Sequence, residues 1–306
     1  MILTQPAHVA ILMCTYNGAE FIKKQLKSFE DQTHSNWSLW VSDDGSSDET
    51  LDIIRVFQDR HPNRTIEIFE GPKAGFSQNF QSLLLRKIDA DYYAISDQDD
   101  IWHPEKLERA ATIMSERNID LYGGRTSTML NSGAEIGCSP LFTKPTVFQN
   151  ALVQSIMGGN TMMLSRQFSQ FVGQTTMMDV ASHDWWLYML CTGSGRRVFY
   201  DQRPMLSYRQ HGGNIIGANT GWKARINRIF RLFRGDFAIW NATNVNALKA
   251  HLFMLTPQSQ EAVLSFESLR KRRGFPALLE LKRLGLFRQT KVGQIALFVS
   301  AFCGRL

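Results

Sequence analysis

The sequence predicts an α/β protein with a mixed, mainly parallel sheet and a basic helical C-terminal region. Short β-rich runs alternate with segments of helical periodicity over residues 1–125. Repeated strand-helix alternation forms right-handed crossovers, which place helices on both faces of a parallel sheet. Residues 125–215 are less regular and contain several glycine-rich turns, so we expect mixed strands and loops there.

Hydrophobic periodicity places the individual elements. Apolar runs predict strands, and apolar residues that repeat every three or four positions predict helices. The expected strands cover 8–14, 37–42, 65–69 and 91–96, and the expected helices cover 21–29, 51–57, 76–88 and 104–117. Pro104 suits the first turn of the last helix, because N–H groups in a first turn have no partner within the helix.

Three polar clusters directly follow three of the expected strands. They are Thr15-Tyr16-Asn17, Asp43-Asp44 and Asp97-Gln98-Asp99-Asp100. The carboxyl ends of parallel strands meet at one edge of a sheet, and α/β proteins bind their ligands there. We therefore expect the three clusters to form one site.

The cluster at 97–100 holds three carboxylates within four residues. Such a concentration of negative charge suits Mg²⁺ or Mn²⁺ held jointly with substrate phosphates. The alternative is a simple turn before the helix at Pro104, since aspartates are common in turns and near helix N-termini. The residues alone leave both interpretations open.

The turn Asp43-Asp44-Gly45-Ser46 is open to two interpretations as well. A carboxylate on the expected rim could accept the imide or amino proton of a nucleobase, but an Asp-Gly pair after a strand is often only a turn. Tyr16 could stack on a base or pack as a half-buried aromatic residue.

His183-Asp184-Trp185-Trp186 places a carboxylate between a histidine and two large aromatic residues. Such neighbours exclude water and favour a general base, whereas the alternative is a loop carboxylate held by a backbone N–H or an indole. His211 precedes Gly212 and Gly213, and could be a ligand or a hydrogen-bonded loop histidine.

Charge is divided unevenly along the chain. Residues 222–306 hold 15 Lys and Arg against 4 Asp and Glu, a balance of +11, whereas residues 1–221 hold 19 against 24, a balance of −5. We expect one domain at 1–221 and a basic helical extension at 222–306. Trp222, Ile226 and Phe230 share one helix face opposite basic residues, which favours contact with a membrane surface over nucleic-acid binding.

Composition and motifs limit the compartment and the chemistry. The apolar stretches are shorter than the roughly 18 to 20 residues of a membrane-spanning helix, and the four scattered cysteines fit neither a disulfide framework nor a zinc site. We expect a cytoplasmic protein. The sequence contains no GxSxG, GxxxxGK[ST], GxGxxG after the first strand, or HExxH, so any nucleotide would be held by carboxylates and a metal.

Taken together, the motifs resemble those of the family 2 glycosyltransferases of the GT-A fold. The similarity covers about residues 8–215, and its order and spacing both agree with the family. It rests on Cys14-Thr15-Tyr16-Asn17, the 43–46 turn with Asp48, Asn79, the 97–100 cluster with Trp102-His103-Pro104-Lys106, Gly158-Gly159-Asn160-Thr161 and His183-Asp184. Tyr208-Arg209-Gln210-His211 and Gly217 resemble the bacterial rhamnosyltransferase-type subgroup.

The resemblance implies a role for each matching residue. Asp184 would be the catalytic base, and Asp97 and Asp99 would hold Mg²⁺ or Mn²⁺ and the diphosphate, with His211 as a further metal contact. The residues implied for the nucleotide-sugar are Thr15, Tyr16, Asn17, Asp43, Asp44, Asn79 and Asp97. The sequence lacks the QxxRW motif of processive members, which favours addition of a single sugar.

The expected function is inverting sugar transfer, with L-rhamnose moved from dTDP-L-rhamnose to a lipopolysaccharide core, O-antigen or other surface-glycan precursor. A UDP-hexose donor would need no change in any of these motifs. A nucleotidyltransferase, a nucleic-acid-binding protein and a non-catalytic sugar-nucleotide-binding module are further alternatives. The expected location is peripheral, on the inner face of the bacterial cytoplasmic membrane.

Overall fold

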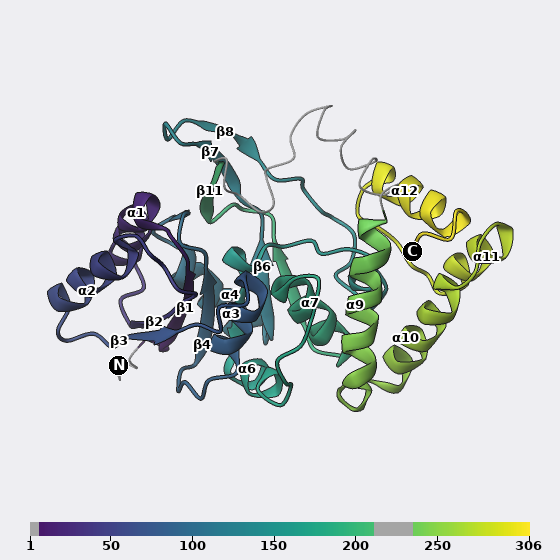
Figure 1. The fold of residues 1–306 in the computed structure, drawn as a ribbon, viewed down its shortest axis with the longest axis horizontal. Helices are drawn as coiled ribbons and strands as arrows, with labels where there is room; N and C mark the ends of the chain where they lie inside the picture. The colour runs from purple at the N-terminus through teal and green to yellow at the C-terminus, as the bar shows by residue number, and fades with distance from the viewer. Residues whose placement is uncertain (1–5, 211–234) are drawn as a thin grey trace. The chain divides into compact units, whose positions relative to one another are not determined.

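A computed structural model describes residues 6–210 and 235–306 of the chain (Figure 1). The chain divides into two compact units, and each is continuous in space but not in sequence. The first unit contains described residues up to 140, 157–177 and 197–210, and the second contains 141–156, 178–196 and 235–306. The expected boundary at 221/222 and the expected helix that starts at Trp222 lie outside the described residues, and both stay predictions.

The first unit is built on a seven-stranded sheet with strand order β10-β6-β9-β4-β1-β2-β3. All neighbouring strands are parallel except β9, which runs antiparallel to β4 and to β6. The mixed, mainly parallel sheet expected from the sequence is therefore confirmed. The strands are β1 (Val9–Thr15), β2 (Trp37–Asp43), β3 (Ile66–Glu70), β4 (Tyr92–Ser96), β6 (Leu121–Gly124), β9 (Met163–Ser165) and β10 (Val198–Asp201).

Helices cover both faces of this sheet. Alternate residues of β1, Val9, Ile11 and Met13, share one core with α1 (Ala19–Glu30), α2 (Thr50–Arg60) and α4 (Lys106–Arg117). On the other face Ser42 of β2 lies beside Ser82 of α3 (Phe76–Leu84). Alternation of side chains along a strand explains this division.

Two helix boundaries differ from the expected ones. α3 ends at Leu84 rather than at 88, because the N–H of Arg86 bonds to the carbonyl of Leu83 and closes the last turn. α4 begins at Lys106, so Pro104 precedes the helix instead of occupying its first turn. Helix ends depend on such local bonds, which periodicity does not report.

The irregular stretch after residue 125 contributes three of the four strands of a second sheet, whose order is β5-β11-β7-β8. Its strands are β5 (Ile101–Trp102), β11 (Leu206–Gln210), β7 (Ser127–Leu130) and β8 (Glu135–Cys138). β5 begins directly after the acidic cluster at 97–100, so this sheet fixes one end of the acidic turn. The short helices η1 (Gly159–Thr161) and α6 (Arg166–Val172) flank β9.

The second unit is helical, as expected for the C-terminal region. It contains α5 (Phe148–Ala151), α7 (His183–Gly193), α9 (Asp236–Ala250), η2 (Leu252–Met254), α10 (Pro257–Arg270), α11 (Phe275–Arg283) and α12 (Lys291–Phe302). Pro257 occupies the first turn of α10, and the Thr256 hydroxyl caps that helix by accepting the N–H of Ser259. Among the helices of the two described ranges, none is long and apolar enough to cross a membrane.

Candidate active site

The first unit brings three strand ends to one edge of the large sheet. β1 and β2 pair from Val9 opposite Trp37 to Thr15 opposite Asp43, and Met13 of β1 lies opposite Ser96 of β4. The loops after these strands therefore begin side by side. The three polar clusters expected to meet at one rim do meet there.

The loops are joined to one another by hydrogen bonds. The Gln98 amide accepts the Tyr16 N–H at 2.9 Å and donates to the Tyr16 carbonyl at 2.9 Å. A side chain at position 18 would displace this amide, because a Cβ atom there would lie 2.2 Å from the Gln98 Oε1 atom. The Tyr16 side chain is 59% exposed, so its ring is free to meet a ligand.

Asp43 is buried at the end of β2 and its carboxylate is occupied by the protein itself. Its Oδ1 accepts the hydroxyls of Thr15 at 2.7 Å and Ser46 at 2.6 Å, and its Oδ2 accepts the N–H groups of Gly45 at 3.1 Å and Ser46 at 2.8 Å. A carboxylate offers about four acceptor positions. The Asp43 carboxylate and the Thr15 hydroxyl are therefore already hydrogen-bonded to each other, and Asp43 also holds the turn at Gly45 and Ser46.

Asn17 continues the same loop. It has a φ of 46°, in the left-handed region that asparagine tolerates better than most residues. Its N–H donates to the Ser46 hydroxyl at 2.9 Å, and its side-chain oxygen accepts the Ser47 N–H at 2.8 Å. Asn17 thus links the loop after β1 to the loop after β2.

Asp44 is half-buried and faces the segment between β3 and α3. Its two oxygens accept the N–H groups of Lys73 at 2.6 Å and Gly75 at 2.9 Å. Asn79 of α3 donates to the Ser42 carbonyl at 3.0 Å, while its buried Oδ1 has no hydrogen-bond partner within the described ranges. A Cβ atom on Gly71 would lie 2.7 Å from that Oδ1 and 2.9 Å from the Asp44 Oδ1. Both oxygen atoms therefore lie close to the Gly71 backbone, where a side chain would not fit without displacing them.

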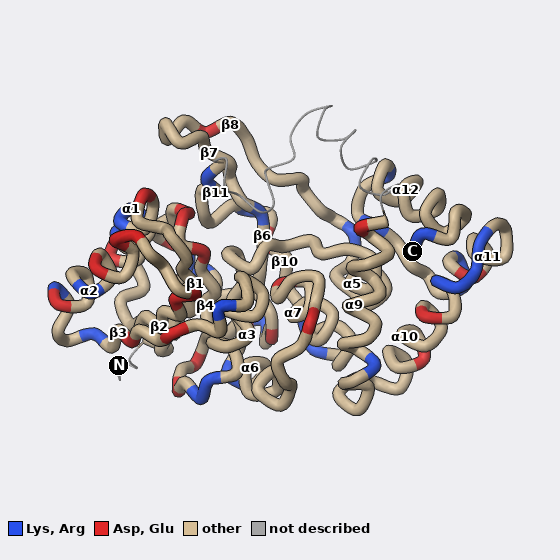
Figure 2. Tube along the Cα trace, viewed as in Figure 1, with Lys and Arg blue, Asp and Glu red and all other residues tan. Residues whose placement is uncertain are grey.

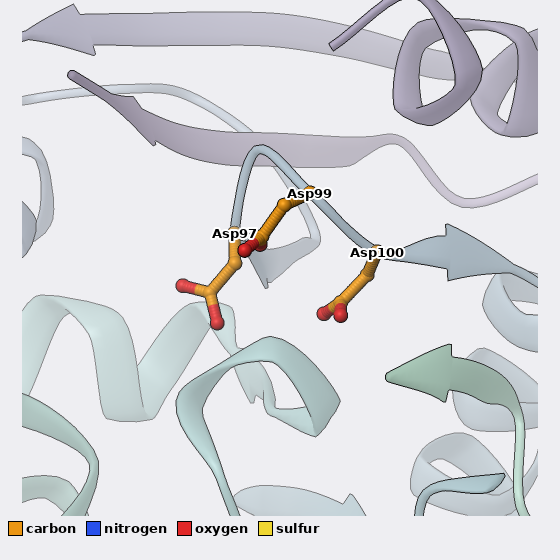
Figure 3. Close-up of side chains that lie close together, drawn as sticks. All are labelled: Asp97, Asp99 and Asp100. Atoms are coloured by element: carbon orange, nitrogen blue, oxygen red, sulfur yellow. The ribbon is translucent and has the colours of Figure 1, made fainter. Parts of the chain in front are cut away.

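The acidic turn after β4 places three carboxylates close together. Oxygen atoms of Asp97, Asp99 and Asp100 all lie within 4.8 Å of one another. Figure 3 shows the three side chains projecting to the same side of the turn. Asp97 and Asp99 are half-buried, and Asp100 is fully buried.

Asp100 also belongs to the cluster, although the sequence predicted only Asp97 and Asp99 of this cluster as metal ligands. Its Oδ2 accepts the side-chain N–H of Asn160 at 2.6 Å, and its Oδ1 has no hydrogen-bond partner in the part of the chain that the structure describes. Burial, followed by the charge of Asp99, raises the Asp100 pKa to about 7. A buried carboxylate oxygen without a donor is a strong candidate for a cation contact.

Two buried cations lie beside the acidic turn. Arg209 of β11 donates through its Nε to the Asp99 carbonyl at 3.1 Å. The ammonium of Lys106 lies 3.5 Å from the centre of the Trp102 ring. Burial lowers the Lys106 pKa to about 7, and the charges of Asp100 and Asp97 oppose this effect. These cations offset part of the repulsion among the carboxylates.

The residues present fit a divalent cation. Hard cations such as Mg²⁺ and Mn²⁺ prefer oxygen ligands and bind through a few carboxylates together with substrate phosphates. The acidic turn supplies such ligands at the rim, and the unpartnered Asp100 oxygen gives an independent reason to place a cation there.

Asp184 belongs to the second unit, where it lies in the first turn of α7. It is half-buried and its Oδ1 accepts the Trp185 N–H at 2.7 Å. The Trp185 indole donates to the Ala151 carbonyl at 2.6 Å, and Asn244 of α9 accepts the Ala181 N–H at 3.0 Å. The segment that carries Asp184 is therefore fixed from both sides within its unit.

His183 differs from its neighbour. It is fully buried, and burial lowers its pKa to about 4 while the charge of Asp184 opposes the shift. The sequence suggested that water is excluded from Asp184, but Asp184 is only half-buried and it is His183 that is buried. His211, the expected metal contact, lies outside the described residues and stays a prediction.

Sequence reasoning missed several residues of the rim. Asp100 could have been included, because three carboxylates in four residues give no reason to omit one of them. Asn160 was part of a recognised motif but had no assigned partner. Gln98, Lys106 and Arg209 stand in motifs that carry the family resemblance, but sequence alone assigned them no role, since their roles depend on their contacts in the fold.

The sheet and its covering helices have the GT-A fold. The chain belongs to Glycosyl transferase family 2, whose model matches residues 10–169. Among curated proteins, it is 31% identical over 279 residues to "dTDP-rhamnosyl transferase RfbG" of Shigella flexneri, covering 85% of this chain and 95% of that protein. It is also 26% identical to "Putative teichuronic acid biosynthesis glycosyltransferase TuaG" of Bacillus subtilis, covering 71% of this chain and 83% of that protein.

Solved structures share the fold at low sequence identity. A mannosyltransferase of Pyrobaculum calidifontis in complex with GDP-Man and Mn²⁺ has a TM-score of 0.53 at 16% identity, covering 98% of this chain and 88% of that chain. TarS 1–349 of S. aureus in complex with UDP-GlcNAc has a TM-score of 0.57 at 14% identity, covering 97% and 88%. The protein is therefore a family 2 glycosyltransferase, and the nucleotidyltransferase and non-catalytic alternatives are set aside.

Proposed function

We propose that this enzyme moves one L-rhamnose from dTDP-L-rhamnose to a lipopolysaccharide, O-antigen or other cell-surface glycan precursor, with inversion at the anomeric carbon and dependence on Mg²⁺ or Mn²⁺. The observation that carries the chemistry is the acidic turn, whose three carboxylates lie within 4.8 Å of one another at the rim of the sheet. The donor is suggested by the dTDP-rhamnosyl transferase that is similar over 85% of the chain.

Different segments of the rim would hold different parts of the donor. Tyr16 offers an exposed ring on which a base could stack, and Asp44 and Asn79 offer acceptors for the base or the ribose. Asp97, Asp99 and Asp100 would hold the cation and position the diphosphate, together with His211, which lies outside the described residues. When bound, the cation would stabilise the negative charge of the departing nucleoside diphosphate.

Asp184 would act as the general base. Its carboxylate would take the proton of an acceptor hydroxyl as the oxygen attacks the anomeric carbon, while the bond from that carbon to the diphosphate breaks on the opposite side. Attack from that side inverts the configuration. The bonds that hold the Ala181 backbone and the Trp185 indole support this role, because a general base must be held at the proton it removes.

A UDP-hexose donor is the second candidate. A relative named as a UDP-Glc-dependent β-1,3-glucosyltransferase, WfgD of Escherichia coli, is 30% identical over 129 residues, 42% of this chain and 49% of that protein. The rim residues would contact the pyrimidine, the metal and the phosphates, all of which both donors share. The two candidates differ in the transferred sugar, in the 2′-hydroxyl that UDP carries and dTDP lacks, and in the 5-methyl group that thymine carries and uracil lacks.

A panel of nucleotide-sugars tests both candidates in one experiment. The full chain is titrated with dTDP-L-rhamnose, UDP-glucose, UDP-GlcNAc and GDP-mannose, with Mn²⁺, with Mg²⁺ and with chelator, and binding and slow donor hydrolysis are recorded. Selective, cation-dependent binding and hydrolysis of dTDP-L-rhamnose are expected. Selectivity for a UDP-sugar would replace the donor, and binding unaffected by chelator would overturn the metal assignment.

The proposed location is peripheral, at the inner face of the cytoplasmic membrane, where lipid-linked acceptors are presented. The basic composition of residues 222–306 supports this location, because cationic segments are attracted to anionic head groups. The domain division at 221/222 belongs to the same proposal, with the catalytic chemistry before it and the membrane contact after it.

A further inference from the structure

α11 and α12 form a hairpin that buries only one of its faces. The Gly274 N–H before α11 bonds to the carbonyl of Phe302, the last residue of α12, at 2.7 Å, so the two helices run antiparallel. Ala277 and Leu281 of α11 and Leu297 and Ala301 of α12 are buried in the second unit. These residues already anchor the hairpin to its own unit.

The other side of the hairpin exposes large apolar side chains. Phe275 and Leu279 of α11 are 74% and 70% exposed, and they are one helical turn apart. On α12 the exposed apolar residues are Val292, Ile295, Val299 and Phe302, spaced along one stripe. The rings of Phe275 and Phe302 meet at 5.7 Å, which joins the two stripes into one continuous surface. We name these six residues the hairpin face.

Positive charge surrounds the hairpin face. Residues 271–306 hold eight Lys and Arg and one acidic residue, Glu280, a balance of +7. Glu280 is already paired with Arg283 and Arg272. A Cβ atom on Gly304 would lie 3.3 Å from the Cβ of Arg273, so the chain end that carries Arg305 lies beside Arg272 and Arg273. Figure 2 shows Lys and Arg concentrated on α11 and at the ends of α12.

The combination points to one kind of partner. We propose that the hairpin face is the site at which this enzyme docks on an anionic lipid surface, with the six apolar side chains inserted among the acyl chains and the basic residues on the head groups. This inference rests on the proposed peripheral location and assigns it to particular residues. Apolar residues flanked by Lys and Arg are the pattern of interfacial helices.

Charge also disfavours a second copy of the chain as the occupant. An isologous contact through the hairpin face would bring two sets of basic residues against each other, with a balance of +7 on each side. Like charges at an interface oppose association unless acidic groups separate them. An anionic lipid surface instead supplies the opposite charge over the whole face.

The test compares two variants of the full chain. The double variant Phe275→Ser, Leu279→Ser removes two exposed side chains from the hairpin face. The control, Phe253→Ser, removes a 73% exposed phenylalanine from η2, which precedes α10, whereas α11 follows α10, a 14-residue helix about 21 Å long. Sedimentation with phosphatidylglycerol-containing vesicles and with neutral phosphatidylcholine vesicles is measured at low and high salt.

Wild type and Phe253→Ser should bind the anionic vesicles and release them at high salt, and the double variant should bind at least about tenfold more weakly. Donor hydrolysis, which needs no membrane, should be equal in all three proteins. Unchanged vesicle binding by the double variant, or no binding by wild type at low salt, would overturn the proposal. Concentration-dependent dimerisation lost only in the double variant would overturn it in favour of a second copy.

The same measurements separate this inference from the proposed function. If the protein binds anionic vesicles through the hairpin face but hydrolyses none of the donors, the rhamnosyl transfer proposal fails and the docking surface stands. If it hydrolyses dTDP-L-rhamnose but does not bind vesicles, the docking surface fails and the rhamnosyl transfer proposal stands.

Discussion

The acidic turn of the first unit and the hairpin face of the second unit both concentrate charge of one sign, but they treat it differently (Figure 2). At the turn, carboxylates are drawn together and one of them, Asp100, is fully buried. Around the hairpin face, seven of the eight Lys and Arg of residues 271–306 are exposed to solvent. Buried like charge needs a compact counter-ion, whereas exposed like charge suits an extended anionic surface.

Removing a carboxylate from the turn gives the largest effect. Asp99→Ala should abolish detectable donor binding in Mg²⁺ or Mn²⁺, because the cation loses a ligand. Calorimetric titration with donor and metal measures this, and thermal melting checks the fold. Asp59→Ala, an exposed carboxylate of α2, is the matched control. If Asp99→Ala still binds donor with unchanged metal dependence, the acidic turn is not the metal site that we propose.

The second unit should contribute to turnover without contributing to the metal site. Asp184→Asn is expected to leave donor and metal binding intact and to lower turnover by about 10² to 10⁴, the range that general-base catalysis supplies. Asp236→Asn, in the first turn of α9 of the same unit, should leave turnover unchanged. Single-turnover transfer to acceptor measures both. Near-normal turnover of Asp184→Asn would assign that residue to structure.

The hydrogen bond between Asn160 and Asp100 tests how the first unit tolerates a buried carboxylate. Asn160→Ala leaves the Asp100 Oδ2 without its 2.6 Å donor, which should cost about 1 to 3 kcal/mol of unfolding free energy in chelator. Urea unfolding measures the loss, and Asn131→Ala in an exposed turn is the control. Equal stability of the two variants would mean that the carboxylate finds another partner or becomes protonated at no cost.

Buried His183 gives the second unit a pH dependence of its own. Burial lowers its pKa to about 4, so the unfolded chain binds more protons than the folded one between that pH and the ordinary histidine value of about 6.5. Stability should therefore fall as pH decreases from 7 to 5, by on the order of 1 to 2 kcal/mol. Denaturant melts of wild type and His183→Gln measure it, and the variant should lack this contribution. An NMR titration that protonates the ring near pH 6 would contradict the prediction.

Much of the first unit follows from local sequence. The apolar runs of β1, β2 and β4 and the polar residues after them predicted where three loops would meet, because strand ends in a parallel sheet share one edge. The order of strands, with β9 inserted antiparallel between β4 and β6, had no such signal. It depends on pairing between segments about 70 residues apart, from Tyr93 to Leu164.

The parts of the site that sequence could not predict depend on side-chain contacts. Asp43 and Asp44 are identical neighbours in the sequence, yet Asp43 is saturated by its own rim and Asp44 reaches the backbone of the next loop. The tail shows the same limit. Composition predicted a cationic, amphipathic region, but the exposed apolar stripe on α11 and α12 becomes visible only once the buried side of the hairpin is known.

The paired bonds between the Gln98 amide and the backbone of Tyr16 have a consequence for donor selection. They make the loop that would meet the base and the turn that would meet the diphosphate move as one piece. A nucleotide whose phosphates fit poorly would displace the acidic turn, and the Tyr16 ring with it. Recognition of the base and recognition of the diphosphate would then be coupled through these two hydrogen bonds. A poor fit of either group would weaken binding of the other.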